Sequence, residues 1–433
     1  MRALSGLTRS VAALLVSLIL ASPAGAQDST ATAEKTPHVA GSGFRLVTDP
    51  NGTLNFKLYA AIRYLNQTAI DDTYTDSFGT TTQMDPRQDL QLNKTMISFL
   101  GWFLDPRFRY LAYVWTSNAS LGQTSQVVVA GNLGWKFSDA FDTGIGVMSL
   151  PGTRSTQGNW PYWLSQDTRL IADEFFRPSY TTGIWSKGRI AHGLDYNAMW
   201  GNNLSQFGID AGQLDNQMNT FSGALSWLPT TGEYGPTNGY GDYEDHERLA
   251  TRLGLHYTYS EENRQGQPST EAPENSQIRL SDGNVIFSPG LFGPGSVVTD
   301  IRYQMASGDF GFKKSGFALE GDYFLRRVDD IRGLSLESLA FDHLVDQGAQ
   351  VQLSAMLKPK ELQVYAAGSK IFGEYGDPWD AKLGLNWFPA RTQTVRLNAE
   401  WIRVDRSPVG ALSLPLLVGA TGSIYHANIE VNF

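Results

Sequence analysis

The segment from Pro151 to Phe175 concentrates charges of both signs in a short stretch of chain. Its charged side chains are Arg154, Asp167, Arg169, Asp173 and Glu174. Opposite charges that face each other across a narrow aqueous passage create a transverse field, which orders water and selects solutes by charge and dipole. We therefore predict that these residues form a pore constriction. The alternative interpretation is an ordinary exposed loop.

The same segment carries the aromatic group Trp160, Tyr162 and Trp163. Aromatic faces stack on apolar surfaces of ring-shaped solutes, including the apolar faces of sugars. The group is therefore compatible with a sugar-selective channel. Packing within the loop or at the membrane interface explains the same residues, and both interpretations stay open.

Neither catalytic nor metal-binding motifs are evident in the chain. The six histidines form no H-E-x-x-H, and no G-x-S-x-G accompanies them. Cysteine is absent, which rules out disulfides, thiolate ligands and a cysteine nucleophile. We predict no enzymatic activity, no catalytic residue, no metal site and no cofactor. A dispersed barrel active site involving His256 is the enzymatic alternative.

The elements that must position these residues show a predominant period-two alternation. Between Leu54 and Tyr64 apolar and polar side chains largely alternate, and the pattern returns at 249–259, 317–325, 349–357, 383–387 and 395–401. A strand with one face toward lipid and the other toward a polar lumen has this pattern. Short turns broadly alternate with longer polar loops, as in bacterial barrels.

We therefore predict an all-β fold, a transmembrane antiparallel β-barrel of about 16 strands, over residues 53–433. The predicted strands are 53–67, 89–104, 108–119, 125–137, 142–150, 176–187, 190–200, 219–228, 247–261, 298–309, 316–328, 347–357, 361–371, 380–389, 393–405 and 423–433. This count places the long connection 229–245 on the side of the short turns, where it is an exception. A soluble propeller or sandwich would also alternate.

Strand parity predicts which charged side chains face the lumen. The cationic candidates are Lys57, Arg63, Arg252, Arg326, Lys382 and Arg396, and the anionic ones are Glu320, Asp322, Glu400 and Glu430. Charges in a polar lumen are commonly solvated or paired. Replacing Arg63 and Arg326 is expected to lower anion preference if these two residues line the constriction.

Both ends of the chain indicate export to a bacterial outer membrane. Arg2 and Arg9, the apolar run 11–20 and the small residues ending at Ala26 predict a signal peptide over 1–26. Residues 27–52 are then expected to form a short periplasmic tether. The last strand ends on Phe433, which resembles the C-terminal signature bound by the outer-membrane assembly machinery.

Composition excludes several classes of protein. The formal net charge of −9 gives no support to a nucleic-acid surface, which needs clustered Lys and Arg. After the signal, no apolar run is long enough for a transmembrane helix, although strands escape that test. The acidic residues Asp71, Asp72 and Asp76 are expected in an external loop, where they would meet lipopolysaccharide through bridging cations or stay solvated.

From about Asn55 onward the chain resembles the phosphate-selective porin O/P family of Gram-negative outer membranes. The resemblance is carried, in order, by Ser281-Asp282-Gly283, Gly316-Phe317, Gly321-Asp322-Tyr323, Arg326-Arg327, Asp346-Gln347-Gly348, Asn386-Trp387-Phe388-Pro389, and Gly419 with Gly422. It implies a sixteen-stranded homotrimer. The matched positions are mainly turns and wall strands, so they transfer architecture better than selectivity.

Together these observations predict an outer-membrane porin for passive diffusion of small hydrophilic solutes, with anions such as phosphate among them. A sugar-selective channel and a barrel-anchored surface binding protein are the alternatives.

Overall fold

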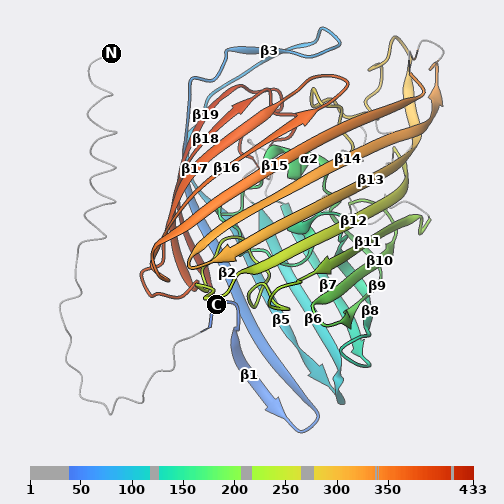
Figure 1. Ribbon diagram of the computed structural model, residues 1–433. Helices are drawn as coiled ribbons and strands as arrows, with labels where there is room; N and C mark the ends of the chain where they lie inside the picture. Colours follow the sequence, from blue (N-terminus) through green and yellow to red (C-terminus); the bar gives the residue numbers. More distant parts are fainter. Residues whose placement is uncertain are drawn as a thin grey trace, which may run out of the picture. The chain divides into compact units, whose positions relative to one another are not determined.

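The structure, a computed structural model, describes residues 39–117, 126–205, 217–264, 277–336, 339, 341–410 and 414–433. They form a closed antiparallel β-barrel of 16 strands (Figure 1). No helix within these ranges is long and apolar enough to cross a membrane.

The barrel strands are β2 (Gly52–Thr68), β5 (Gln88–Phe103), β6 (Asp105–Ser117), β7 (Gln126–Lys136), β8 (Asp142–Ser149), β9 (Tyr180–Ala191), β10 (Leu194–Gly201), β11 (Thr220–Trp227), β12 (Ala250–Asn263), β13 (Val297–Lys314), β14 (Phe317–Leu334), β15 (His343–Lys358), β16 (Leu362–Phe372), β17 (Trp379–Trp387), β18 (Val395–Asp405) and β19 (Gly422–Asn432). Outside the barrel wall lie β1 (Phe44–Asp49), the hairpin β3 (Thr73–Thr75) and β4 (Thr81–Gln83), the 3₁₀ turn η1 (Arg154–Thr156) and the helix α2 (Ile171–Phe176).

Each wall strand pairs with its neighbour in the chain, and β19 closes the barrel against β2. Closure satisfies every strand edge, which is what a sheet in lipid requires. The fold class and the number of strands predicted from the sequence are confirmed, and every wall strand overlaps a predicted segment.

Strand β12 illustrates the physical basis of the pattern. Leu253, Leu255 and Tyr257 are exposed on the outer face, whereas Arg252 and His256 are buried on the inner face. The apolar residues face the position of the lipid, and the polar residues face the barrel interior.

The connections fall into two sets at the two ends of the barrel. Short turns, such as Ser315–Gly316 between β13 and β14, alternate with long loops, such as residues 150–179 between β8 and β9. We call the ends the turn end and the loop end; in bacterial barrels the turn end is periplasmic. Residues 228–249 join β11 to β12 at the turn end despite their length, as the strand count predicted.

Strand β1 is an element that the sequence did not indicate, because the tether was expected to run to residue 52. It pairs with the first residues of β2, from Gly52 to Phe56, whereas β19 pairs with β2 only from Tyr59 onward. Phe44 in β1 lies 5.9 Å from Phe433, measured between ring centroids. The β1–β2 hairpin thus extends the wall at the turn end (Figure 1).

Aromatic rings follow the turn end on strands β5 to β8. Phe103, Phe108, Trp135 and Phe137 form a chain of ring contacts with centroid separations of 4.3–6.2 Å. This arrangement is typical of an interfacial girdle. Phe388, after strand β17, is by contrast buried against residue Tyr243 of the 228–249 connection.

Candidate functional site

The loop of residues 150–179, here called L3, folds into the barrel and packs against one part of the inner surface of the wall. Its helix α2 contacts strands β14 to β17. Phe176 stacks on Phe324 of β14, with ring centroids 5.2 Å apart. A Cβ at Gly348 would lie 2.4 Å from the Phe176 ring, so only glycine allows this approach. L3 therefore lies inside the barrel, against strands β14 to β17.

Basic side chains from the wall hold the backbone of L3. Arg63 donates to the carbonyl of Gln166 at 2.8 Å, and Lys382 donates to the carbonyl of Arg169 at 2.8 Å. Arg396 bonds the carbonyl of Trp163 and pairs with Glu430. Because cations bind carbonyl oxygens well in a site shielded from water, these bonds fix the path of the loop.

A second segment enters the lumen from the turn end. This inner connection, residues 228–249, meets L3 at the buried ion pair between Arg154 and Glu320, whose N···O distance is 2.7 Å. Glu320 also accepts from the hydroxyl of Tyr234 at 3.1 Å and from the backbone of Gly241 at 2.9 Å. The Arg154 guanidinium lies over the ring of Tyr240, 4.1 Å from its centroid. One ionic centre thus ties L3, the inner connection and strand β14 together.

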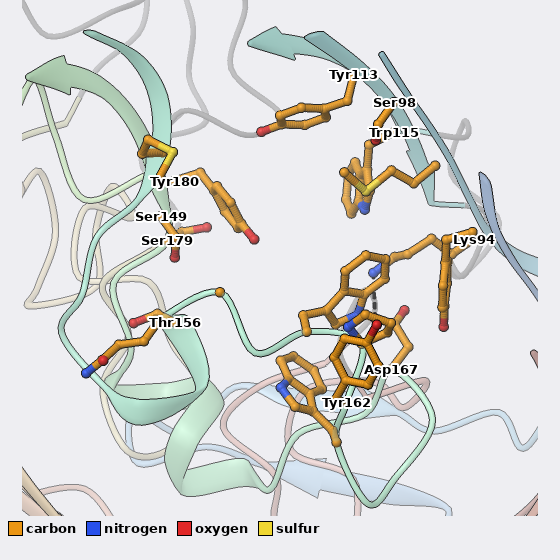
Figure 2. A pocket seen from close by; sticks show the side chains of 18 of the residues that line it. Lys94, Ser98, Tyr113, Trp115, Ser149, Thr156, Tyr162, Asp167, Ser179 and Tyr180 are labelled. Atoms are coloured by element: carbon orange, nitrogen blue, oxygen red, sulfur yellow. Dashed lines mark hydrogen bonds and ion pairs between the residues drawn. The ribbon is translucent and has the colours of Figure 1, made fainter. Parts of the chain in front are cut away.

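L3 and the inner connection leave a cavity of about 920 Å³ on the opposite side of the barrel interior, here called the passage. In the described part of the chain, its wall residues come from β2, β5 to β10 and β19, and none comes from β11 to β18. The lining extends from Gly41 and Asn432 at the turn end to Arg279 and Gly410 in loops at the other end. Tyr113, Trp115 and Tyr180 point toward this space, which L3 borders (Figure 2).

Cations outnumber carboxylates among the described lining residues. The cations are Lys57, Lys94, Arg169, Arg177, Lys187 and Arg279, and the carboxylates are Asp167 and Glu174. The passage therefore has the opposite sign to the whole chain, whose net charge is −9.

Both carboxylates are already paired with cations. Asp167 accepts from Lys94 at 2.6 Å, and Glu174 pairs with Arg177 at 2.5 Å and with Arg169 at 3.3 Å. Neither carboxylate is therefore free to attract a cation from solution. By contrast, Lys57, Lys187 and Arg279 have no ion-pair partner among the described residues.

Burial shifts the pKa of charged groups in L3. It raises the pKa of Asp173, an effect that the nearby Arg169 partly offsets. It also lowers the pKa of Arg169, and the neighbouring positive charge of Arg177 acts in the same direction. Asp173 accepts from Ser155 at 2.9 Å and from Thr153 at 3.1 Å, so it organises the start of L3 rather than facing the passage.

The structure separates the predicted constriction residues into two groups. Asp167, Arg169 and Glu174 line the passage. Arg154 and Asp173 also belong to L3, but they are buried and are absent from the lining.

Most predicted lumen-lining residues point into the barrel but are covered. Lys57 lines the passage. The others, which are buried inside the barrel, are Arg63, Arg252, Arg326, Lys382, Arg396, Glu320, Asp322, Glu400 and Glu430. Strand parity gives the face of a side chain, but it cannot tell which part of that face a loop will occupy. Arg63 and Arg326 therefore anchor other segments instead of lining the constriction.

Several lining residues were not singled out from the sequence. They include the cations Lys94, Arg177, Lys187 and Arg279, and a set of apolar residues on β5 and β6. Strand β5 has apolar side chains on both faces, with Met96 and Leu100 inward and Ile97 and Phe99 outward. Alternation was therefore too weak there to distinguish the lumen face.

Within the described ranges, no group of three or more His, Asp or Glu side chains is placed to hold a metal ion. The aromatic side chains predicted in L3 lie at the passage: Trp160 and Tyr162 border it, and Trp163 lies beneath Arg169 at 4.2 Å from its guanidinium.

Comparison with known proteins gives structural matches but no sequence match. No protein-family model and no curated sequence matches the chain. An anion-selective porin from Comamonas acidovorans superposes with a TM-score of 0.55 at 10% identity, over 88% of this chain and 100% of the porin. OmpT of Vibrio cholerae gives 0.53 at 10% identity, over 89% of this chain and 99% of OmpT. The outer-membrane channel DcaP of Acinetobacter baumannii gives 0.53 at 9% identity, over 90% of this chain and 99% of DcaP.

The chain thus has the fold of a Gram-negative outer-membrane β-barrel of the porin type. Identities near 10% establish the architecture alone, so the chemistry of the passage has to be argued from its own residues.

Proposed function

We propose that this protein is an outer-membrane porin through which small hydrophilic solutes diffuse passively, with a preference for anions. The observation that carries the proposal is the charge of the passage: six cations and two carboxylates among its described lining residues, with both carboxylates paired. Fixed cations in a narrow pore raise the local concentration of anions and repel cations.

The positions of the cations support this preference along the whole passage. Arg279 lies in the loop between β12 and β13, whereas Arg169 and Arg177 belong to L3. Lys57 and Lys187 lie on wall strands toward the turn end. An anion would therefore meet positive charge at the loop end, beside L3 and near the periplasmic side.

The proposal includes inorganic phosphate among the permeating anions and a homotrimer as the assembled form. The resemblance of the chain to phosphate-selective porins favours both, and a trimer form of OmpT from Vibrio cholerae is known. We further propose that residues 1–26 are a signal peptide removed after Ala26 and that Phe433 is recognised by the outer-membrane assembly machinery.

The test is the reversal potential of the purified channel in a planar bilayer under a potassium chloride gradient. We expect the sign of an anion-preferring pore. The double substitution Lys57→Glu and Lys187→Glu should move the potential toward that of a non-selective pore, because it reverses two charges that have no ion-pair partner in the described part of the chain.

Lys360→Glu makes the same kind of change at an exposed turn outside the passage and should leave the potential unaltered. A cation-preferring wild-type channel would contradict the proposal. Membrane insertion without conductance would instead favour the barrel-anchored binding protein.

A further inference from the structure

The lumen face of strands β5 and β6 carries a patch of apolar side chains where a porin normally presents polar ones. Met96 and Leu100 of β5 lie opposite Trp115 and Leu111 of β6. Tyr113 stands between these two β6 residues. All five line the passage and are here called the apolar stripe; Ser98 lies between Met96 and Leu100 on the same strand face. The lumen of such barrels is ordinarily polar, because it holds water.

Met96, Leu100, Leu111 and Trp115 of the apolar stripe are partly exposed, whereas Tyr113 is buried. Helix α2 packs on the opposite wall, at β14 to β17. Met96, Leu100 and Leu111 belong to none of the hydrophobic clusters formed by the described residues. An apolar surface left open to water inside a cavity of this size is characteristic of a binding site for an apolar group.

A free cation stands directly beside the apolar stripe. Lys57 of β2 is paired in register with Ser98 of β5, and Ser98 is paired with Tyr113 of β6. Directly paired side chains on one face of a sheet are close neighbours, with Cβ atoms about 5 Å apart. Lys57 forms no ion pair with any described residue, so its charge is available to a solute.

More rings and another cation lie on the side of L3. Lys94 lies 5.0 Å from the ring centroid of Trp115 and 5.3 Å from that of Trp160. Trp160 also donates to Asp167 at 2.9 Å, which holds its ring at the edge of the passage. A flat solute on the apolar stripe would therefore meet aromatic rings at its margin.

We propose that the passage contains a binding site for aromatic carboxylates, with the ring on the apolar stripe and the carboxylate at Lys57. This inference rests on the proposed function and names a substrate class for it. Inorganic phosphate has no apolar face and would lose hydration against Met96, Leu100 and Leu111. A neutral sugar gains no electrostatic attraction from the surplus of cations, and its hydroxyl groups make little favourable contact with aliphatic side chains.

Benzoate is the probe, tested as a blocker of single-channel current in planar bilayers. Acetate carries the charge without the ring, benzyl alcohol carries the ring without the charge, and glucose represents the neutral sugars. We expect half-block by benzoate at a concentration roughly tenfold or more below that of each of the other three, the scale of one good aromatic or ionic contact.

Two substitutions test the two parts of the site. Leu100→Ser removes apolar surface from the stripe, and Lys57→Gln removes the free cation. Each should raise the half-blocking concentration of benzoate about tenfold. The matched controls are Leu104→Ser, at the exposed turn after β5, and Lys360→Gln, at another exposed turn; both should leave benzoate block unchanged.

The outcomes separate this inference from the proposed function. An anion-preferring channel that benzoate blocks no better than acetate would overturn the aromatic site alone. Equal block by benzyl alcohol and benzoate would show that charge plays no part, and stronger block by glucose would point to a sugar site; both outcomes overturn it. A cation-preferring wild-type channel would overturn the proposed function itself.

Discussion

The substitution Glu320→Gln tests whether the buried ionic centre holds L3 in the lumen. Glu320 accepts from Arg154 at 2.7 Å and Tyr234 at 3.1 Å through one oxygen, and from the backbone of Gly241 at 2.9 Å through the other. Glutamine has the same shape, but its amide nitrogen cannot accept a hydrogen bond. At least one of these bonds must therefore be lost, and Arg154 loses its counter-charge.

The expected cost follows from the burial of the pair. Both side chains are only 1% exposed, and removing one partner of a buried ion pair typically costs about 3–5 kcal/mol. We expect a value of about 3 kcal/mol, because Arg154 keeps its bond to the carbonyl of Gly239 and its contacts with two tyrosine rings. This free-energy cost weakens the packing of L3 and the inner connection, since the hydrogen bonds between the barrel strands are unchanged.

The assay combines single-channel recording with thermal unfolding followed by the heat-induced mobility shift on a gel. Glu320→Gln should give noisier or larger conductance, as L3 leaves its position for part of the time, and should lower the unfolding midpoint. Glu361→Gln is the matched control, because Glu361 makes its ion pairs with Lys358 and Arg391 at the protein surface, where solvent screens them. A Glu320→Gln channel with wild-type conductance and midpoint would refute the reasoning.

Two further predictions concern the other segments in the lumen. Replacing residues 229–248 by a two-residue turn should raise the conductance, because Tyr234, Thr237 and Tyr240 leave the lumen; an unchanged conductance would show that the inner connection does not limit the pore. Burial raises the pKa of Asp173, so the folded state binds this proton more tightly than the unfolded chain, and stability should fall as the pH rises above the ordinary aspartate pKa of about 3.9. Asp173→Asn should flatten that part of a stability profile measured against pH, whereas an identical wild-type slope would contradict the assignment.

The sequence was sufficient to predict the barrel, because its physics is local and repetitive. Each wall strand must show lipid an apolar residue at every second position, and closure leaves no strand edge to be satisfied elsewhere. The same regularity placed L3 between β8 and β9 and placed the long connection after β11 at the turn end. Strand β1 was not predicted from the sequence, because its six residues show no alternation and all of them are exposed.

Only the tertiary structure decided which inward-facing residues meet the passage. Arg63 and Lys57 share a strand face, yet Arg63 is covered by L3 whereas Lys57 is open. The path of L3 depends on contacts between residues far apart in sequence, such as Arg154 with Glu320 and Arg396 with the carbonyl of Trp163. Period-two alternation tells which side of a sheet a residue faces, but the occupant of that side is set by long-range packing, and no local pattern records it.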